Sequence, residues 1–314
     1  TGLEVAAPAL LAAGCRTFFV AHLSEARRMR ALSADAVIYV LNGLVAGTEE
    51  IYARLDARPV LGSMAELGDW RTFCAGTGWA GPAALHVDTG MSRLGVTPVQ
   101  ARSMTKTDLP RLSLVMSHFA CADEPAHPLN RRQIEAFRDV QALFPTTPAS
   151  LANSSGLFLP EDVAFDMVRP GIALYGAASG PAVQLAGLRM AMSVHSRILG
   201  IRELPAGAKV SYGHRLTLTR DSRLGIVPVG YADGYPRRMS GQAQVLVRGH
   251  RCAVLGNITM DVSMIDVTDL PDAREGERVT LLGSQGRERL AVYELAGWAD
   301  VIPYEITCGI SKRV

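Results

Sequence analysis

Two short segments of the chain combine small hydroxyl residues, glycine and one arginine in a way that suits the binding of an anion. Residues 153–156 read Asn-Ser-Ser-Gly and follow the apolar run 149–152. Residues 169–172 read Arg-Pro-Gly-Ile and follow the apolar run 165–168. Small residues let backbone amides approach an anion closely, and a guanidinium adds a permanent positive charge. The two segments predict a phosphate site, with Asn153 among its residues, although each could be an ordinary turn that caps a helix.

Further polar residues follow two other apolar runs. Residues 88–95 read Asp-Thr-Gly-Met-Ser-Arg-Leu-Gly, and residues 117–119 read Ser-His-Phe. Arg93 is either a ligand for an anion or a surface charge after a tight turn. His118 is either a functional group or a packing residue with a hydrogen bond, because a single histidine does not distinguish the two.

Two tyrosines in the second half of the chain stand in turns flanked by glycine. Tyr212 belongs to Val-Ser-Tyr-Gly at 210–213, and Tyr231 belongs to Gly-Tyr-Ala-Asp-Gly-Tyr at 230–235. A phenol in such a turn can project into a site, or it can fill a gap and keep its hydroxyl in water. The pattern alone favours the second role.

Seven apolar runs with amphipathic segments between them must position these residues. The runs begin near residues 17, 36, 58, 83, 112, 148 and 165. Helical periodicity is predicted over 2–14, 24–33, 48–57, 64–77, 97–107 and 129–143. Unbroken apolar strands that alternate with helices are typical of a parallel sheet.

The order of these elements predicts a (β/α)8 TIM barrel that lacks its first strand in this chain, because a helix at 2–14 precedes the first run. A doubly wound sheet is the alternative, but it usually needs only five or six strands. In such a barrel the loops after strands seven and eight often hold a phosphate. With the first strand missing, the runs 149–152 and 165–168 are those two strands, so both anion-binding segments fall at the expected loops.

After about residue 185 the pattern changes to short β-branched runs separated by Gly, Pro and Asp, with one helical segment at 291–298. Such runs are typical of antiparallel strands. We therefore expect an α/β barrel domain over residues 1–183 and a mainly antiparallel β domain over residues 184–314.

Composition excludes several classes of protein. Of 314 residues, 48% are hydrophobic and 20% are charged, which excludes a disordered or collagen-like chain. The net charge of +2 gives no reason to expect nucleic acid or a membrane surface as a partner. The five cysteines are scattered without a CxxC pair, which predicts free thiols, no metal site and a cytoplasmic protein. No apolar stretch reaches the ~18 residues of a membrane-spanning helix.

Six segments resemble the signature sequences of the alanine racemases, in the family's order and across nearly the whole chain. They are residues 87–95, 169–176, 210–213, 230–235, 257–261 and 304–305. The resemblance implies a TIM barrel joined to a β domain, pyridoxal 5′-phosphate (PLP) as cofactor, and a homodimer. It also implies interconversion of L-alanine and D-alanine, which supplies D-alanine for cell-wall peptidoglycan.

The resemblance further implies roles for individual residues. Tyr212 matches the tyrosine that reaches the opposite subunit's site as one of two bases, the other being the lysine that carries the cofactor. Arg169 matches the arginine that faces the pyridine nitrogen, and His118 belongs with it to the hydrogen-bond network around the tyrosine. The other matches are the phosphate ligands Ser154, Gly171, Ile172 and Tyr304, and the substrate residues Arg93, which also approaches the cofactor, Tyr231, Met260 and Asp261.

One departure from the family pattern concerns the catalytic lysine. The chain has three lysines, Lys106, Lys209 and Lys312, and none stands at the end of a predicted barrel strand. In the family this lysine lies in a Lys-Ala-x-x-Tyr-Gly segment just before the residues that match Thr1 and Gly2. We therefore expect the chain as written to be inactive.

A second departure is His86, which stands where many family members have a carbamylated lysine that orients the arginine matching Arg93. An imidazole does not form that stable carbamate. His86 either leaves Arg93 to another partner, such as a bound chloride, or packs in its strand without an orienting role.

Three other functions are possible for a chain of this pattern. A broad-specificity racemase of the same fold is the nearest alternative, and it would differ in the pocket around Tyr231 and Met260. A non-catalytic PLP carrier has a barrel alone, so the β domain with Tyr212 argues against it. Decarboxylases of this fold carry a different β domain.

Overall fold

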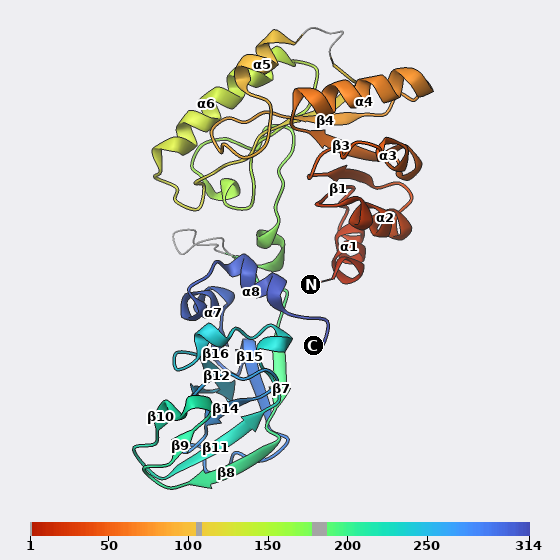
Figure 1. Ribbon diagram of the computed structural model, residues 1–314. Helices are drawn as coiled ribbons and strands as arrows, with labels where there is room; N and C mark the ends of the chain where they lie inside the picture. Colours follow the sequence, from red (N-terminus) through yellow and green to blue (C-terminus); the bar gives the residue numbers. More distant parts are fainter. Residues whose placement is uncertain (1, 105–108, 178–186) are drawn as a thin grey trace. The chain divides into compact units, whose positions relative to one another are not determined.

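The computed structural model describes residues 2–104, 109–177 and 187–314. The chain divides into two compact units, residues 2–171 and residues 172–314 (Figure 1). The boundary predicted between residues 183 and 184 lies outside the described residues and stays a prediction.

The N-terminal unit is built on a parallel sheet whose strands follow one another in chain order, each paired with the next (Figure 1). The strands are β1 (Thr17–Val20), β2 (Val37–Val40), β3 (Ala57–Leu61), β4 (Ala83–His86), β5 (Leu112–Met116) and β6 (Ala149–Ser150). The helices are α1 (Leu3–Ala12), α2 (Leu23–Leu32), α3 (Glu49–Leu55), α4 (Met64–Thr77), α5 (Pro98–Ser103) and α6 (Pro128–Leu143). In a (β/α)8 barrel each strand pairs with the next one along the chain, as here, whereas in a doubly wound sheet the strand order reverses at one point. The predicted fold class is confirmed.

Both faces of this sheet are apolar, which explains the unbroken apolar runs in the sequence. In β2, Ile38 belongs to one buried cluster together with Trp70 of α4. Its neighbour Tyr39 points to the opposite face and belongs to a second cluster with Leu114 and Met116 of β5. Successive side chains of a strand point to opposite faces, so each strand must be apolar throughout when both faces are covered.

The strand predicted at 165–168 is not formed, and this prediction is wrong. Phe165 has a φ of +47°, which a β-strand does not allow. The Asp166 carboxylate accepts the amide of Ala149 at 2.8 Å in place of a backbone carbonyl. The segment nevertheless follows β6, since the amide of Arg169 donates to the carbonyl of Ala152 at 2.9 Å. Arg169 is therefore still placed beside the end of β6.

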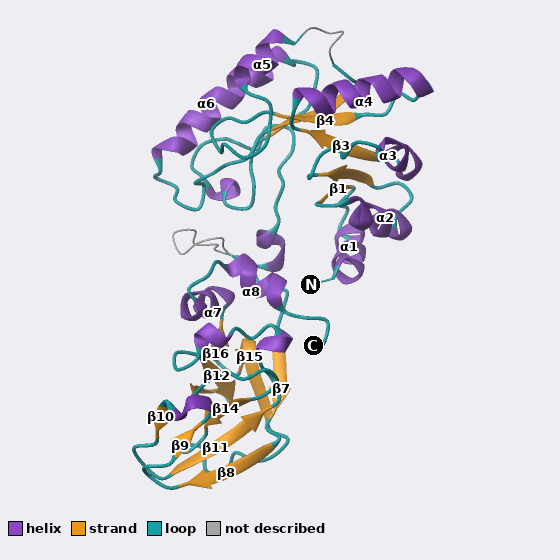
Figure 2. Ribbon diagram, in the orientation of Figure 1, coloured by secondary structure: helices purple, strands orange, loops and turns teal. Residues whose placement is uncertain are grey.

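In its described residues, the C-terminal unit contains antiparallel strands, as predicted, and two α-helices (Figure 2). The larger sheet contains β7 (Val194–Arg197), β8 (Gly200–Leu204), β11 (Ser222–Val227), β12 (Gln244–Val247), β13 (His250–Leu255), β14 (Ser263–Asp266), β15 (Arg278–Gln285) and β16 (Glu288–Leu290). A small ribbon pairs β9 (Lys209–Val210) with β10 (Leu216–Thr217). The helices are α7 (Val292–Ala299), which confirms the helical segment predicted at 291–298, and α8 (Pro303–Gly309).

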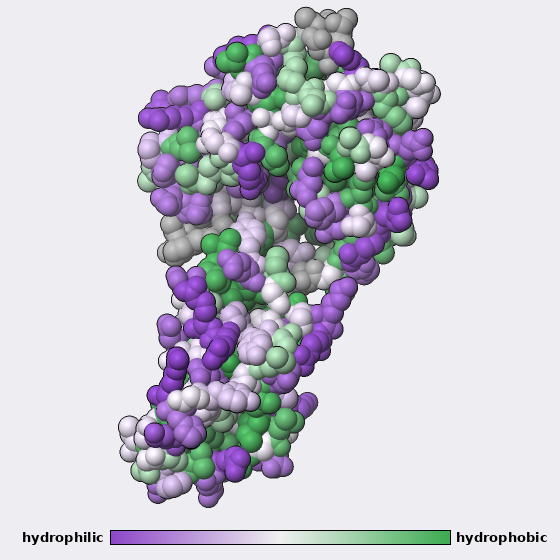
Figure 3. Space-filling view, viewed as in Figure 1, coloured by the Kyte–Doolittle hydropathy of each residue, from purple (hydrophilic) through white to green (hydrophobic). Residues whose placement is uncertain are grey.

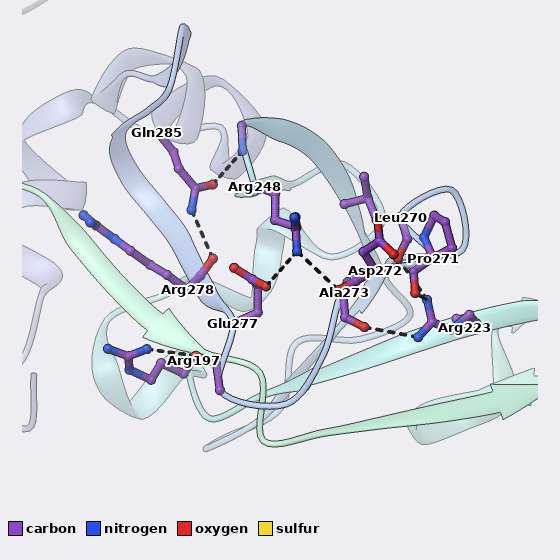
Figure 4. Close-up of polar contacts among 12 residues, drawn as sticks. Arg197, Arg223, Arg248, Leu270, Pro271, Asp272, Ala273, Glu277, Arg278 and Gln285 are labelled. Atoms are coloured by element: carbon purple, nitrogen blue, oxygen red, sulfur yellow. Dashed lines mark hydrogen bonds and ion pairs between the residues drawn. The ribbon is translucent and has the colours of Figure 1, made fainter.

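Three arginines hold the loop between β14 and β15 through its main-chain carbonyls (Figure 4). Arg223 of β11 makes three such bonds, of 2.9, 2.9 and 3.1 Å. Arg197 of β7 and Arg248 each add one, of 2.8 and 3.3 Å. Charged donors thus satisfy carbonyls that no strand pairing reaches.

None of the helices in the described parts of the chain has the length and apolar character needed to cross a bilayer. Hydrophilic and hydrophobic residues are interspersed over the face shown in Figure 3.

Candidate active site

The two predicted anion-binding segments lie next to each other. The amide of Gly171 donates to Oγ of Ser154 at 2.7 Å. A Cβ on Gly171 would lie 3.8 Å from this Oγ, an ordinary contact distance. Asn153 shapes the turn by accepting the amide of Gly156 at 2.9 Å, and its Nδ2 lies 3.5 Å from Nε2 of His118. Amides and hydroxyls gathered in such turns form the kind of cradle that binds phosphate.

Arg169 lies at the centre of the polar cluster in the N-terminal unit. Its guanidinium donates to Oγ of Ser150 at 2.5 Å and to the carbonyl of Ser117 at 2.5 Å. It also lies 3.4 Å from Nδ1 of His118. No carboxylate pairs with Arg169 among the residues that the structure describes. Burial lowers the pKa of the guanidinium to about 10, so Arg169 stays cationic at neutral pH. Such a cation is suited to an anion or an aromatic nitrogen as a further partner.

Both histidines of the cluster are neutral at neutral pH. Burial, followed by the charges of Arg169 and Arg93, lowers the pKa of His118 to about 3. Burial and the charge of Arg169 lower the pKa of His86 to about 4, although Asp88 opposes the shift. His86 is 8% exposed at the end of β4. The positive charge of the cluster therefore comes from its arginines.

Arg93 is exposed on the loop after β4, and no described residue forms a hydrogen bond or ion pair with its side chain. The loop itself is ordered by Asp88, whose Oδ1 accepts the amides of Gly90 and Met91 at 2.9 and 2.8 Å. Gly95 closes the loop with a φ of +116°, and a Cβ there would come within 2.6 Å of the Asp88 amide. The charge of Arg93 is near enough to lower the pKa of both histidines.

Two of the site residues predicted in the C-terminal unit, Tyr231 and Met260, stand on neighbouring turns. Tyr231 donates its amide to the carbonyl of Thr259 at 3.0 Å, and Ala232 does the same to Met260 at 3.1 Å. A Cβ on Gly230 would collide with the carbonyls of both Thr259 and Met260, so only glycine allows this approach. The structure thus brings Tyr231 and Met260 together.

The other site residues of this unit have different surroundings. Asp261 accepts a hydrogen bond of 2.8 Å from Arg313. Ile172 is buried and begins the short 3-10 helix Ile172–Tyr175, whereas Tyr304 lies in the first turn of α8. Tyr212 begins another short 3-10 helix, Tyr212–His214, and its side chain is 74% exposed.

Several residues that hold the site were missed in the sequence. Ser117 and Ser150 accept hydrogen bonds from Arg169, as described above. Gln133 of α6 is fully buried, donates to the carbonyl of His118 at 2.9 Å and accepts the amide of Ala120 at 2.9 Å. A glutamine on the apolar face of a helix was the only signal in the sequence, and it does not identify the partner.

Comparison with known proteins completes the assignment. The family model of the alanine racemase N-terminal domain matches residues 1–179, and that of the C-terminal domain matches residues 191–314. The chain belongs to the alanine racemase family. The predicted membership is confirmed, and it places the chain among the amino-acid racemases, which are isomerases.

Relatives and solved structures agree with this assignment. The alanine racemase of Methylobacterium sp. (strain 4-46) is 45% identical, covering 100% of this chain and 86% of the relative. The alanine racemase of Rhizobium meliloti (strain 1021) is 40% identical, covering 99% and 85%. The crystal structure of the Bartonella henselae alanine racemase, with covalently bound pyridoxal phosphate, has a TM-score of 0.92 and 36% identity, covering 99% of this chain and 87% of that one.

Proposed function

We propose that this alanine racemase family member interconverts L-alanine and D-alanine in the cytoplasm with PLP as its cofactor, and that the product supplies cell-wall peptidoglycan. One observation in the structure carries the proposal. Arg169, a cation without a described carboxylate partner, stands in the same cluster as the cradle of Ser154 and Gly171.

The residues of the cluster fit the cofactor. Asn153, Ser154 and Gly171 would hold the phosphate, together with the Ile172 amide and Tyr304. Arg169 would face the pyridine nitrogen and donate a hydrogen bond without giving up its proton, since its pKa of about 10 keeps it charged. When bound, PLP supplies an electron sink to the carbon that loses its proton.

Racemisation requires that a proton leave one face of Cα and that another return to the opposite face, so two proton-transferring groups are needed. Tyr212 is one of them. Its exposed ring supports a homodimer in which each chain lends this tyrosine to the other. The second group is the lysine of the family's Lys-Ala-x-x-Tyr-Gly segment, which the 314 residues do not contain.

The substrate carboxylate would meet the amide of Met260 and the guanidinium of Arg93. Asp261 stands beside Met260, and its charge is balanced by Arg313, with a distance of 2.8 Å between Oδ1 and Nη2. Tyr231 would line the entrance to the site, because its backbone is bonded to the turn that carries Met260. His118 would keep the guanidinium of Arg169 in place.

The test is a chiral assay on a chain extended in front of Thr1 by the residues that precede the matched region in the Methylobacterium relative, with the family's Lys-Ala-x-x-Tyr-Gly pattern as the guide to the lysine. With PLP and L-alanine, we expect D-alanine from the extended chain only. The unextended chain and the extended Tyr212→Phe variant serve as controls, and neither should form D-alanine at a comparable rate. PLP absorption that shifts on binding, without D-alanine, would contradict alanine as the substrate and favour another amino acid.

A further inference from the structure

The side chain of Asn257 donates a hydrogen bond to the backbone carbonyl of Tyr212. We propose that Asn257 is a positioning residue, which fixes the Tyr212 turn for proton transfer. The inference rests on the proposed function, in which Tyr212 is one of the two proton-transferring groups.

The backbone of this turn is strained. Ser211 has φ +65° and ψ −179°, a region that is essentially restricted to glycine. His214, at the other end of the turn, has a φ of +47°. A serine persists in such a conformation only when its surroundings fix it. The strain therefore requires contacts that hold the turn, next to a residue whose position matters for function.

Those contacts come from the segment 256–257. Nδ2 of Asn257 donates to the carbonyl of Tyr212 at 2.6 Å. In return, Oγ of Ser211 donates to the carbonyl of Asn257 at 2.9 Å. Gly256 has a φ of +67°, and a Cβ there would lie 2.7 Å from Cβ of Ser211, so the two segments are in direct contact. The reciprocal bonds close a ring around the strained residue.

The side chain of Tyr212 makes no hydrogen bond, among the described residues, that would fix the turn by itself. It is 74% exposed, and no hydrogen bond to its hydroxyl occurs among the residues that the structure describes. The position of the phenol on this chain is therefore set by its backbone. The Asn257 bond is the side-chain hydrogen bond that the structure shows at the Tyr212 carbonyl.

Asn257 is in turn held by buried structure. The next residue, Ile258, is fully buried and donates its amide to Oγ of Ser240 at 2.9 Å. The same segment continues to Thr259 and Met260, whose carbonyls accept the amides of the Tyr231 turn. One rigid segment thus carries the group that holds Tyr212 and the residue proposed to bind the substrate carboxylate.

The first experiment measures the turn directly and needs neither cofactor nor activity. Hydrogen–deuterium exchange with mass spectrometry is followed in the peptide covering residues 209–217 of the 314-residue chain. We expect exchange of the His214 amide, which is bonded to the Ser211 carbonyl at 3.2 Å, to become about tenfold faster in Asn257→Asp. This variant keeps the shape of the side chain and loses its donor. Asn42→Asp, a matched change in the N-terminal unit, should leave the peptide unchanged.

The second experiment separates positioning from general damage in the lysine-extended, PLP-loaded enzyme. Exchange of the Cα hydrogen with D2O is measured separately for L-alanine and D-alanine. Each enantiomer presents its hydrogen to a different base, so a displaced Tyr212 slows the exchange of one enantiomer selectively. For Asn257→Asp we expect a selective loss of about 10- to 100-fold in kcat, with KM changed less than threefold.

The outcomes are distinguishable. Unchanged exchange in the 209–217 peptide, or equal slowing of both enantiomers, would overturn the role of Asn257 in an enzyme that racemises alanine. If the wild-type extended chain forms no D-alanine, the proposed function fails, and the role in proton transfer fails with it. The peptide measurement would then still report whether Asn257 holds the turn.

Discussion

The side chain of Arg169 is held by neutral groups of the protein, which leaves its positive charge available to a bound ligand. Its hydrogen-bond partners Ser150 and Ser117 are neutral, so its charge remains available. We expect Arg169→Gln to weaken PLP binding about tenfold or more, because it removes a charged donor. Fluorescence titration of the chain with PLP measures this. The exposed Arg131→Gln variant should bind PLP like the wild type, and equal affinities for all three proteins would contradict the role of Arg169.

His86 makes the stability of the N-terminal unit depend on pH. Its folded-state pKa of about 4 is below the ordinary value of 6.5, so between these values the unfolded state binds more protons. The free energy of unfolding should therefore fall as the pH is lowered from 6.5 to 4, by up to about 1.4 kcal/mol per pH unit for this group. Urea denaturation at pH 7, 5.5 and 4.5 measures the slope.

Replacing this histidine tests the cause of that slope. His86→Gln should flatten the pH dependence in part, since His118 also has a lowered pKa and remains. The same change at exposed His250 is the control. If His86→Gln has the wild-type slope, the pH dependence arises elsewhere.

At the scale of elements, the strands that are most readily predicted from the sequence are those whose side chains are buried on both faces of the sheet. The strands β1 to β5 were predictable because both of their faces are covered, which forces unbroken apolar runs. In β13, only Cys252 and Val254 are buried, and the exposed His250, Arg251 and Ala253 interrupt the apolar pattern, so the strand was not predicted. The segment 165–168 is apolar but is not a strand, because the backbone of Phe165 and the carboxylate of Asp166 interrupt the pairing. Helix α8 was not predicted from the sequence.

The β14–β15 loop allows a test of how much its arginines stabilise. Arg223→Met removes three bonds from a charged donor to main-chain carbonyls, and we expect a loss of about 2 kcal/mol in the free energy of unfolding. Arg220→Met is the control, because Arg220 forms an exposed ion pair with Asp269, and exposed ion pairs contribute little to stability. Chemical denaturation of both variants measures the difference. Equal losses would show that the loop does not depend on Arg223.

At the scale of the whole molecule, the motifs predicted a site but not the residues that support it. The glycine, arginine and tyrosine turns were recognisable because their residue types suit anion binding and proton transfer. The contacts of Gln133 and Asn257 were not predictable, because Gln133 bonds to residues 13 and 15 positions away and Asn257 to one 45 positions away. Such tertiary partners leave no pattern in one sequence.

The proposed homodimer predicts that activity depends on concentration. A monomer lacks the Tyr212 of its partner, so the specific activity of the lysine-extended enzyme should fall on dilution as the dimer dissociates. Sedimentation and racemase assays over the same concentration series measure both quantities. Constant activity per chain in a sample shown to be monomeric would contradict a shared site.

The exposed ring of Tyr212 has a genetic consequence. If each chain lends this ring to the other, a chain with Tyr212→Phe still has a sound cradle, and a chain with Arg169→Gln still has a sound ring. A cell that expresses both defective copies would assemble mixed dimers with one intact centre. Two alleles that each abolish growth without added D-alanine would then complement one another, whereas either allele alone would not.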